Sequence, residues 1–381
     1  MVKEISIKSI LSILATKFTL FLTKTILKGG TTFPGRVALK LDNNILATVS
    51  KGYKVVLVTG TNGKTTTTSM IYNIIKEKGY SVITNNTGAN LFPGIVTTFV
   101  ENYKFFNKDE DKYAIIEVDE ANLKFITKYI NPEIITVTNL FRDQLDRYGE
   151  VYTTLTKILE GITLVPESKL VLNGDESLLG KLDVKNPLVF YGFKTPINEN
   201  KTIDVNADSK FCKFCKTPYS YNFVTYNHLG DYYCTGCGYT HPAIKYGVDE
   251  IVELTAESST VKFGNTEIFL GQSGVYNIYN ALCAYAITKE LDIDQNIPQF
   301  IIKHITNGGV SNARNIALNL SSGDKILFLD ADDYLLSDAG NILKKNMAFD
   351  DDLIIFTHKN VVNGQIKENY IYPNILGLSY T

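Results

Sequence analysis

The sequence lacks any uncharged apolar run of the roughly 18 to 20 residues that a membrane-spanning helix needs. Its most apolar stretch, residues 5–27, is interrupted by Lys8, Lys17 and Lys24. A signal peptide would carry its basic residues before the apolar run, whereas these lysines lie within it. The pattern predicts an amphipathic helix within residues 1–40. This helix could pack on the next domain or lie on the inner face of the membrane, with its lysines toward anionic headgroups, in an otherwise cytoplasmic protein.

The sequence also lacks a strong charge of either sign, low-complexity tracts and repeats of fixed period. The formal net charge of -2 gives no electrostatic case for a nucleic-acid partner. Hydrophobic residues make up 44% and charged residues 20% of the 381 positions, which is typical of globular proteins. This length predicts two or three cores, and the composition leaves a small substrate or a protein partner open.

Cysteine is scarce, and this excludes a disulfide-stapled secreted domain and favours a reducing compartment. Four of the five cysteines form two Cys-x2-Cys pairs that are separated by 18 residues. This spacing is typical of a closed, structural Zn²⁺ site, so we expect a zinc ribbon over residues 208–243. The four expected ligands are Cys212, Cys215, Cys234 and Cys237. His228 and His241 are alternative ligands, but we expect both on surface loops, and we expect Cys283 in the core.

A phosphate-binding loop is predicted at residues 59–66. The β-branched run 55–58 predicts a buried parallel strand, and residues 67–78 are compatible with a helix. Between them stands Thr-Gly-Thr-Asn-Gly-Lys-Thr-Thr. In such a loop, backbone N–H groups and the helix N-terminus surround phosphates, Lys64 reaches the β- and γ-phosphates, and the Thr65 hydroxyl can ligate Mg²⁺.

Further polar groups follow other predicted strands. Residues 113–120 read as a strand whose end presents Glu117, Asp119 and Glu120, and residues 134–138 read as a strand that leads into Asn139. Open α/β sheets bind ligands at this carboxyl edge, although acidic residues at a strand end can also be merely solvated.

Together these motifs resemble the Mur ligases. The loop at residues 59–65 has the form found in Mur ligases and folylpolyglutamate synthetases. Residues 139–147 are similar to the Mur pattern Asn-Leu-x-x-Asp-His-Leu-Asp, with Gln144 in place of the His that helps to hold a second Mg²⁺. Residues 173–176 are similar to a sheet-closing Asn-x-Asp-Asp turn, and residues 274–282 to a helix-opening Gly-x-x-Asn-x-x-Asn-Ala-Leu segment. Lys157 lies near the place of a carbamylated lysine in that family.

This resemblance implies an ATP-binding α/β domain with a mostly parallel sheet, over residues 41–296. It implies Lys64 and Glu117 as catalytic residues, and Thr65 and Glu117 as Mg²⁺ ligands. Asn280 would contact adenine, although Asn at this place could also act as a helix cap. The ATP-binding residues implied are Gly60, Thr61, Asn62, Gly63, Lys64, Thr65, Thr66, Asn139 and Asn280.

The zinc ribbon and the segments 29–36 and 87–94 narrow the resemblance to the Mur ligases that amidate lipid II in peptidoglycan and cell wall biosynthesis. It covers about residues 1–296. It implies ATP-dependent phosphorylation of the D-Glu α-carboxylate, followed by attack of ammonia to give D-isoglutamine. The ammonia would come from a GatD-type glutamine amidotransferase partner.

From about residue 300 the sequence resembles a different family. Residues 307–315 predict a capped helix, and residues 323–333 are similar to the strand and Asp-x-Asp of family 2 glycosyltransferases with the GT-A fold. In that family, residues matching Asp330 and Asp332 bind a divalent metal and the diphosphate of a sugar nucleotide. We therefore expect a partial GT-A-like α/β segment over residues 300–381 in place of the third Mur domain. An alternative function is a hybrid chain that binds nucleotide without ligase activity.

Overall fold

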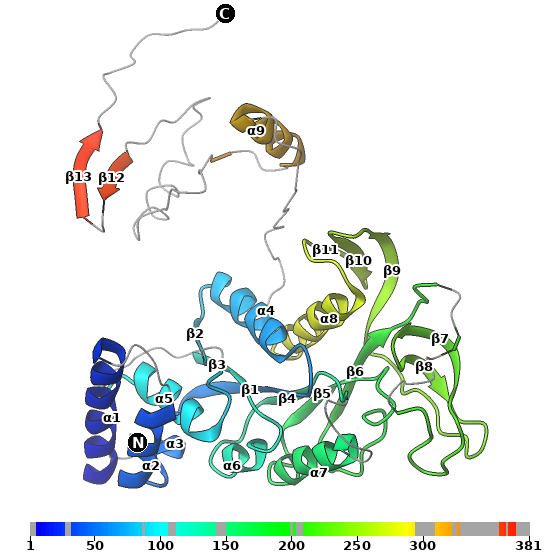
Figure 1. Cartoon of the computed structure of the whole chain (residues 1–381), viewed down its shortest axis with the longest axis horizontal. Coiled ribbons are helices and arrows are strands. Elements are labelled where there is room, and N and C mark those ends of the chain that lie inside the picture. Colours follow the sequence, from blue (N-terminus) through cyan, green and yellow to red (C-terminus); the bar gives the residue numbers. More distant parts are fainter. Residues whose placement is uncertain are drawn as a thin grey trace, which may run out of the picture. The chain divides into compact units, whose positions relative to one another are not determined.

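The computed structural model consists of two compact units, Met1–Ile302 and Lys303–Thr381. Figure 1 shows the helices and strands of both units in chain order. The structure describes residues 5–26, 32–85, 88–105, 112–141, 150–198, 201–202, 209–293, 309–321, 326–327, 358–362 and 365–370.

The first unit is built on a nine-stranded sheet with the order β11-β10-β9-β6-β5-β4-β1-β3-β2. All neighbouring pairs from β2 through to β9 are parallel, whereas β9, β10 and β11 pair antiparallel. This confirms the predicted mostly parallel α/β sheet. The strands are β1 (Tyr53–Thr59), β2 (Ser81–Thr84), β3 (Lys112–Glu117), β4 (Ile134–Val137), β5 (Lys169–Asn173), β6 (Leu188–Phe193), β9 (Tyr246–Leu254), β10 (Ser259–Phe263) and β11 (Thr266–Leu270).

Helices cover both faces of the sheet, which explains why its central strands are apolar throughout (Figure 1). Along β1, Val55 and Leu57 belong to one buried cluster and Val56 and Val58 to the other, since alternate side chains of a strand point to opposite faces. One cluster includes α4 (Lys64–Glu77) and α8 (Val275–Glu290). The other includes α5 (Phe92–Asn102), α6 (Leu123–Thr127) and α7 (Glu150–Ile162).

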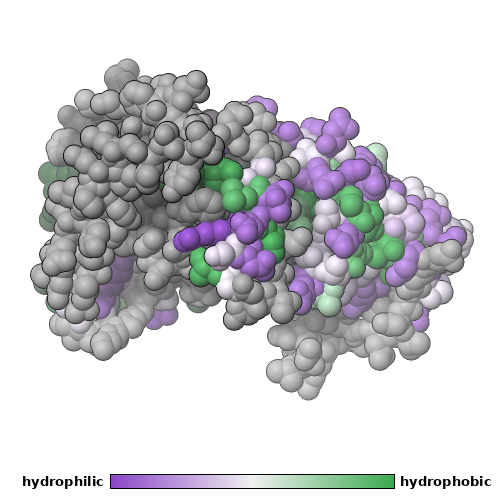
Figure 2. All heavy atoms as spheres, turned by 90° about the horizontal axis from the view of Figure 1, so that it is seen from above, coloured by the Kyte–Doolittle hydropathy of each residue, from purple (hydrophilic) through white to green (hydrophobic). Residues whose placement is uncertain are grey.

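The surface in Figure 2 has hydrophilic residues interspersed with smaller groups of hydrophobic ones. This mixture is ordinary for a folded surface.

The N-terminal helices α1 (Ile7–Ile26), α2 (Thr32–Leu41) and α3 (Ile45–Val49) pack beside α5. On α1, the buried positions include Ser9, Ser12 and Thr16, and the Ser9 hydroxyl donates to Asp42 at 2.7 Å. A Cβ on Gly35 of α2 would come within 1.8 Å of the Pro93 carbonyl oxygen on α5, so this close helix contact requires glycine. The helix thus packs on the neighbouring domain, which is one of its two predicted placements.

Two of the α1 lysines contact groups at the end of α5. Lys17 donates to the Tyr103 carbonyl at 2.6 Å, and Lys24 pairs with Glu101 at 2.5 Å. Both partners lie at the C-terminal end of α5, where the helix dipole favours a cation. Lys8 is exposed. Among the described helices, none combines the length and apolarity that crossing a membrane demands.

A small antiparallel hairpin of β7 (Ser220–Tyr226) and β8 (Leu229–Tyr233) lies in the connection between β6 and β9. Its own core consists of Cys212, Tyr219, Tyr221, Val224, Tyr232, Cys234 and Tyr239. This hairpin and the adjoining cysteine loops are called the ribbon below.

The second unit contains α9 (Gly309–Leu320) and the antiparallel hairpin of β12 (His358–Val362) and β13 (Gln365–Tyr370). The helix agrees with the prediction over residues 309–315 and continues to Leu320, whereas residues 307 and 308 lie outside the described residues. Asp330 and Asp332, the predicted sugar-nucleotide residues, lie outside the described residues.

Candidate functional site

The predicted phosphate loop joins β1 to the N-terminus of α4. Its two glycines have positive φ angles, +118° at Gly60 and +80° at Gly63, a region that favours glycine. A Cβ on Gly60 would lie 2.5 Å from Thr138 Oγ1, and one on Gly63 would lie 2.2 Å from Asn280 Oδ1. The loop is therefore held tightly between the end of β4 and the start of α8, with the positive end of the α4 dipole beside it.

Asn139 braces this loop from the neighbouring strand end. Its side-chain oxygen accepts from the backbone N–H of Asn62 at 3.0 Å, and its side-chain nitrogen donates to the Asn62 carbonyl at 3.1 Å. The Thr138 hydroxyl also donates to the Asn62 carbonyl. The loop's backbone is thus positioned before a ligand arrives.

Lys64, the first residue of α4, points its amine back across the loop. The amine donates to the carbonyls of Gly60 and Thr61 and pairs with Glu120 at 2.9 Å. Both charged side chains are mostly buried, with 15% and 19% exposure. Glu120 is a partner that a phosphate oxygen could replace, and sequence reasoning did not single it out from the acidic run.

Glu117 ends β3 directly beside Thr65. The Thr65 hydroxyl donates to Glu117 at 2.7 Å, and the Asn90 side-chain amide donates to the other carboxylate oxygen at 3.2 Å. Asn85 fixes the Glu117 backbone by accepting from its N–H and donating to its carbonyl, both at 2.9 Å. Hydroxyl and carboxylate oxygens are the donors that Mg²⁺ prefers, so Thr65 and Glu117 could hold this ion.

The other carboxylate of this strand end has a structural role. Asp119 accepts from the backbone N–H of Ala121 at 3.1 Å and from the Asn122 amide at 2.8 Å, which closes a turn before α6. Asn85 and Asn90 were missed because their contribution depends on the return of the chain from β2, which places both beside Glu117.

A cavity of about 360 Å³ opens beside the phosphate loop. This is within the range of small-ligand sites. Asn280 is buried in its wall, 5% exposed, and accepts from the Thr67 hydroxyl at 3.3 Å. The lining residues come from the loop, the ends of β4 and β5, α8 and the ribbon: Asn62, Gly63, Asn139, Phe141, Asn173, Tyr226, Asn227, Leu229, Tyr276, Tyr279 and Asn280.

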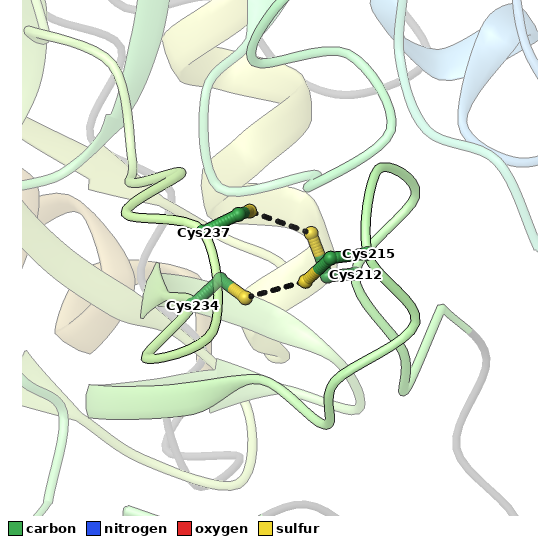
Figure 3. A group of neighbouring side chains, drawn as sticks. All are labelled: Cys212, Cys215, Cys234 and Cys237. Atoms are coloured by element: carbon green, nitrogen blue, oxygen red, sulfur yellow. Dashed lines mark hydrogen bonds between the residues drawn. The ribbon is translucent and has the colours of Figure 1, made fainter.

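The four ribbon cysteines converge on one point, as Figure 3 shows. Their sulfur atoms all lie within 4.8 Å of one another, with Cys212 and Cys237 at 3.6 Å and Cys215 and Cys234 at 3.4 Å. Zn–S bonds of 2.3 Å in a tetrahedron would place sulfur atoms about 3.8 Å apart, so the set fits Zn²⁺.

The two cysteine loops share one geometry. The N–H of Lys216 donates to the Cys212 carbonyl at 2.9 Å, and the N–H of Gly238 donates to the Cys234 carbonyl at 3.0 Å. Both donors have positive φ, 63° and 74°. Two hydrogen-bonding groups of Thr217, its hydroxyl and its backbone N–H, lower the pKa of the Cys215 thiol to about 6, which favours the thiolate that binds metal.

Residues 58–235, which carry the loop, Glu117 and most of the ribbon, match the family description Mur ligase middle domain. This part of the chain therefore resembles the middle domain of the Mur ligases. Residues 284–374 match Glycosyl transferase family 2. The chain therefore combines a Mur-ligase-like domain with a glycosyltransferase-like segment.

The chain is similar in sequence to two proteins whose activity is named. The chain is 39% identical over 292 residues to the lipid II isoglutaminyl synthase (glutamine-hydrolyzing) subunit MurT of Streptococcus pneumoniae, a match that covers 77% of this chain and 65% of that protein. It is 32% identical over 275 residues to the MurT subunit of Staphylococcus aureus strain COL, covering 72% of this chain and 61% of that one. The chain thus spans less than two thirds of the length of these relatives.

A solved structure also resembles this chain. A pseudomurein peptide ligase type C from Methanothermus fervidus superimposes with a TM-score of 0.51 at 26% identity, over 67% of this chain and 50% of that one.

Other residues singled out from the sequence have different outcomes. Lys157 is exposed on α7, and Gln144 lies outside the described residues. Cys283 is fully buried, as expected, 3.3 Å from the Thr136 hydroxyl, and burial raises the pKa of its thiol to about 11.

The prediction that both histidines lie on surface loops is wrong. His228 is fully buried, and its Nε2 lies 2.7 Å from a Glu176 oxygen that is also fully buried. His241 is 10% exposed, and its Nε2 lies 2.8 Å from Asp175. These contacts dock the ribbon of the Mur ligase domain onto the turn after β5. Sequence reasoning missed them because the acidic partners stand more than 50 residues away in the chain.

Proposed function

We propose that the first unit binds ATP with Mg²⁺ and forms the nucleotide-binding part of an ATP-dependent amide ligase subunit that acts on lipid II. The observation that carries this proposal is the grouping of Lys64, Thr65 and Glu117 at one sheet edge of a Mur ligase domain. The acceptor would be the D-Glu α-carboxylate of lipid II. A GatD-type glutamine amidotransferase would supply ammonia.

The proposed reaction has two steps. A carboxylate oxygen attacks the γ-phosphorus of ATP, the bond to the β–γ bridging oxygen breaks, and ADP leaves. Ammonia then attacks the acyl phosphate carbon, inorganic phosphate leaves, and the nitrogen loses a proton to give the amide. Lys64 and the α4 N-terminus would stabilise charge on the transferring phosphoryl group, and Mg²⁺ at Thr65 and Glu117 would neutralise phosphate oxygens.

The test of nucleotide binding is calorimetry with ATP and Mg²⁺ on the full chain. Lys64→Ala should abolish binding while leaving the fold intact, because the amine lies on the phosphate loop. Lys76→Ala, at an exposed position of the same helix, is the matched control and should bind like the unchanged protein. Equal affinities for the unchanged protein and Lys64→Ala would refute the assignment.

The cysteine cluster would hold one structural Zn²⁺ per chain. With four thiolates the site is closed, so the ion would stabilise the ribbon and take no part in chemistry. Metal analysis after purification without chelators should find one zinc per chain, and Cys237→Ser should lose it. Protein without zinc would contradict the proposal.

A second candidate function is favoured by the glycosyltransferase match at residues 284–374. In that case the chain binds nucleotide but does not complete amidation. Amidated lipid II formed with a glutaminase and glutamine, dependent on Lys64, would support the first candidate. Nucleotide binding without that product would support the second.

The exposed face of α1 supports a place on the membrane surface. Ile7, Leu11, Leu14, Phe18 and Phe21 recur at helical spacing, and each is more than half exposed. The helix has no acidic residue, and the ridge from Ile7 to Phe21 is about 21 Å long. An apolar ridge on a basic helix fits the boundary between headgroups and acyl chains, which is where lipid II would be met.

A further inference from the structure

The turn between β7 and β8 reaches from the ribbon into the cavity beside the phosphate loop. Tyr226, Asn227 and Leu229 line this cavity together with Gly63 and Asn280. The ribbon is therefore part of the pocket wall.

Aromatic rings gather around this turn. The Tyr226 ring centre lies 6.1 Å from Phe141 and 6.3 Å from Tyr276, and Phe141 lies 4.8 Å from the His228 ring. Tyr226 is 43% exposed and Tyr276 is 53% exposed. Both rings can offer a face to a planar ligand, and such stacking accepts any base because every base has a π face.

Buried hydrogen bonds fix the turn to the sheet. Besides the contact of His228 with Glu176, the Gly230 N–H donates to the Asp175 carbonyl at 3.2 Å, and the Thr225 hydroxyl lies 2.5 Å from the Tyr279 hydroxyl. Glu176 also accepts from the backbone N–H of Leu140, next to Asn139. One buried carboxylate thus links the ribbon turn to the segment that braces the phosphate loop.

The far end of the ribbon depends on the cysteines. The ribbon's own cluster has seven buried residues, whereas Phe223 and Leu229 of the hairpin pack into the cluster of the main sheet. Two of the seven, Cys212 and Cys234, belong to the cysteine cluster. So small a core needs an added staple such as a metal ion. Without the ion, we expect the hairpin and its turn to lose their fixed position.

We propose that the ribbon turn is the base-side wall of the nucleotide pocket and that the metal at the four cysteines sets the affinity for the base. The ligand class is a nucleoside triphosphate, whose phosphates lie on the loop and whose base meets Tyr226. This deepens the proposed ATP site and rests on it.

The experiment compares ATP with inorganic tripolyphosphate, which occupies the phosphate loop but has no base. Calorimetry on the full chain should show that Tyr226→Ala weakens ATP binding about tenfold and leaves tripolyphosphate binding unchanged. Tyr233→Ala is the matched control, because Tyr233 is a partly exposed tyrosine of the same hairpin that does not line the cavity. The control should bind both ligands normally.

Removing the metal tests whether it sets the affinity for the base. Chelation, or Cys212→Ser, should weaken ATP binding at least as much as Tyr226→Ala, with tripolyphosphate binding and far-ultraviolet circular dichroism retained. Unchanged ATP affinity without metal, or equal loss of both ligands, would overturn the inference. If Lys64→Ala binds both ligands as the unchanged protein does, the proposed ATP site itself is wrong, which is a distinguishable result.

Discussion

At the scale of single residues, the geometry of the site depends on Gly63, which has no Cβ atom. Gly63 combines a φ of +80° with a place against Asn280, and each condition alone disfavours a side chain. The phosphate loop and α8 can approach each other only because this position has no Cβ. The loop sequence alone indicates the need for glycine, but its partner on α8 is visible only in the fold.

Gly63→Ala should abolish ATP binding and destabilise the first unit by more than its backbone strain alone. Gly79→Ala is the matched control, because Gly79 has a φ of +82° and open space where its Cβ would go. The Gly79→Ala control should lose only about 1 kcal/mol of unfolding free energy, through backbone strain. Denaturant unfolding and calorimetry measure both effects, and equal losses in the two variants would contradict the clash with Asn280.

At the scale of elements, α8 is tied to the sheet by a buried carboxylate at its C-terminal end. Burial would raise the pKa of Glu290, but hydrogen bonds from Lys169, Lys245 and Tyr246 at 2.5 to 2.7 Å outweigh it and bring this pKa to about 2. A pKa below the unfolded value means stability that is present above about pH 4.5 and is lost as the pH falls toward 2.

Glu290→Gln should therefore destabilise the protein by about 2 kcal/mol at pH 7 and by much less at pH 2. Denaturant unfolding across this pH range measures the difference. Glu257→Gln, at an exposed position, should change stability little at either pH. A loss for Glu290→Gln that stays constant with pH would show that its charge does not matter.

The apolar ridge of α1 makes a second prediction at this scale. Serine at both Phe18 and Phe21 should reduce binding to vesicles of phosphatidylglycerol and phosphatidylcholine at least tenfold, because each ring would lose about 1.5 to 3 kcal/mol of burial in lipid. The control, with serine at both Val252 and Leu254 on the exposed face of β9, should bind vesicles like the unchanged protein. Sedimentation with vesicles distinguishes these outcomes, and equal binding by all proteins would argue against the ridge.

Most central elements could be predicted from sequence, because β1, β3, β4 and β5 carry continuous apolar runs and α4 follows a glycine loop. The face of α1 that packs against its neighbours could not be predicted from sequence. Its buried stripe is rich in Ser and Thr and its exposed stripe in Leu and Phe, which reverses the usual pattern of a packed helix. The antiparallel edge of β9, β10 and β11 was likewise not predicted, since these strands carry several charged residues and join the sheet through a long connection.

At the scale of the whole molecule, every described residue of the candidate site belongs to the first unit. Of the two candidate functions, we expect the second for the full chain: it should bind ATP through the first unit but not amidate lipid II, even with a GatD-type glutaminase and glutamine. The relatives named for this activity extend beyond the matched part, and residues 284–374 match a different family. Mass spectrometry of lipid II would detect the product, and Lys64-dependent amidation would refute this expectation.

The ribbon is inserted between two neighbouring strands of the sheet without interrupting their pairing. β6 and β9 lie side by side in register, with Tyr191 opposite Tyr246 and Phe193 opposite Val248, and the whole ribbon lies in the connection between them. An insertion or deletion there costs the sheet no hydrogen bonds. The length of this connection can therefore change while the pairing of β6 with β9 is kept, and the histidine contacts to Asp175 and Glu176 are what hold the module in place.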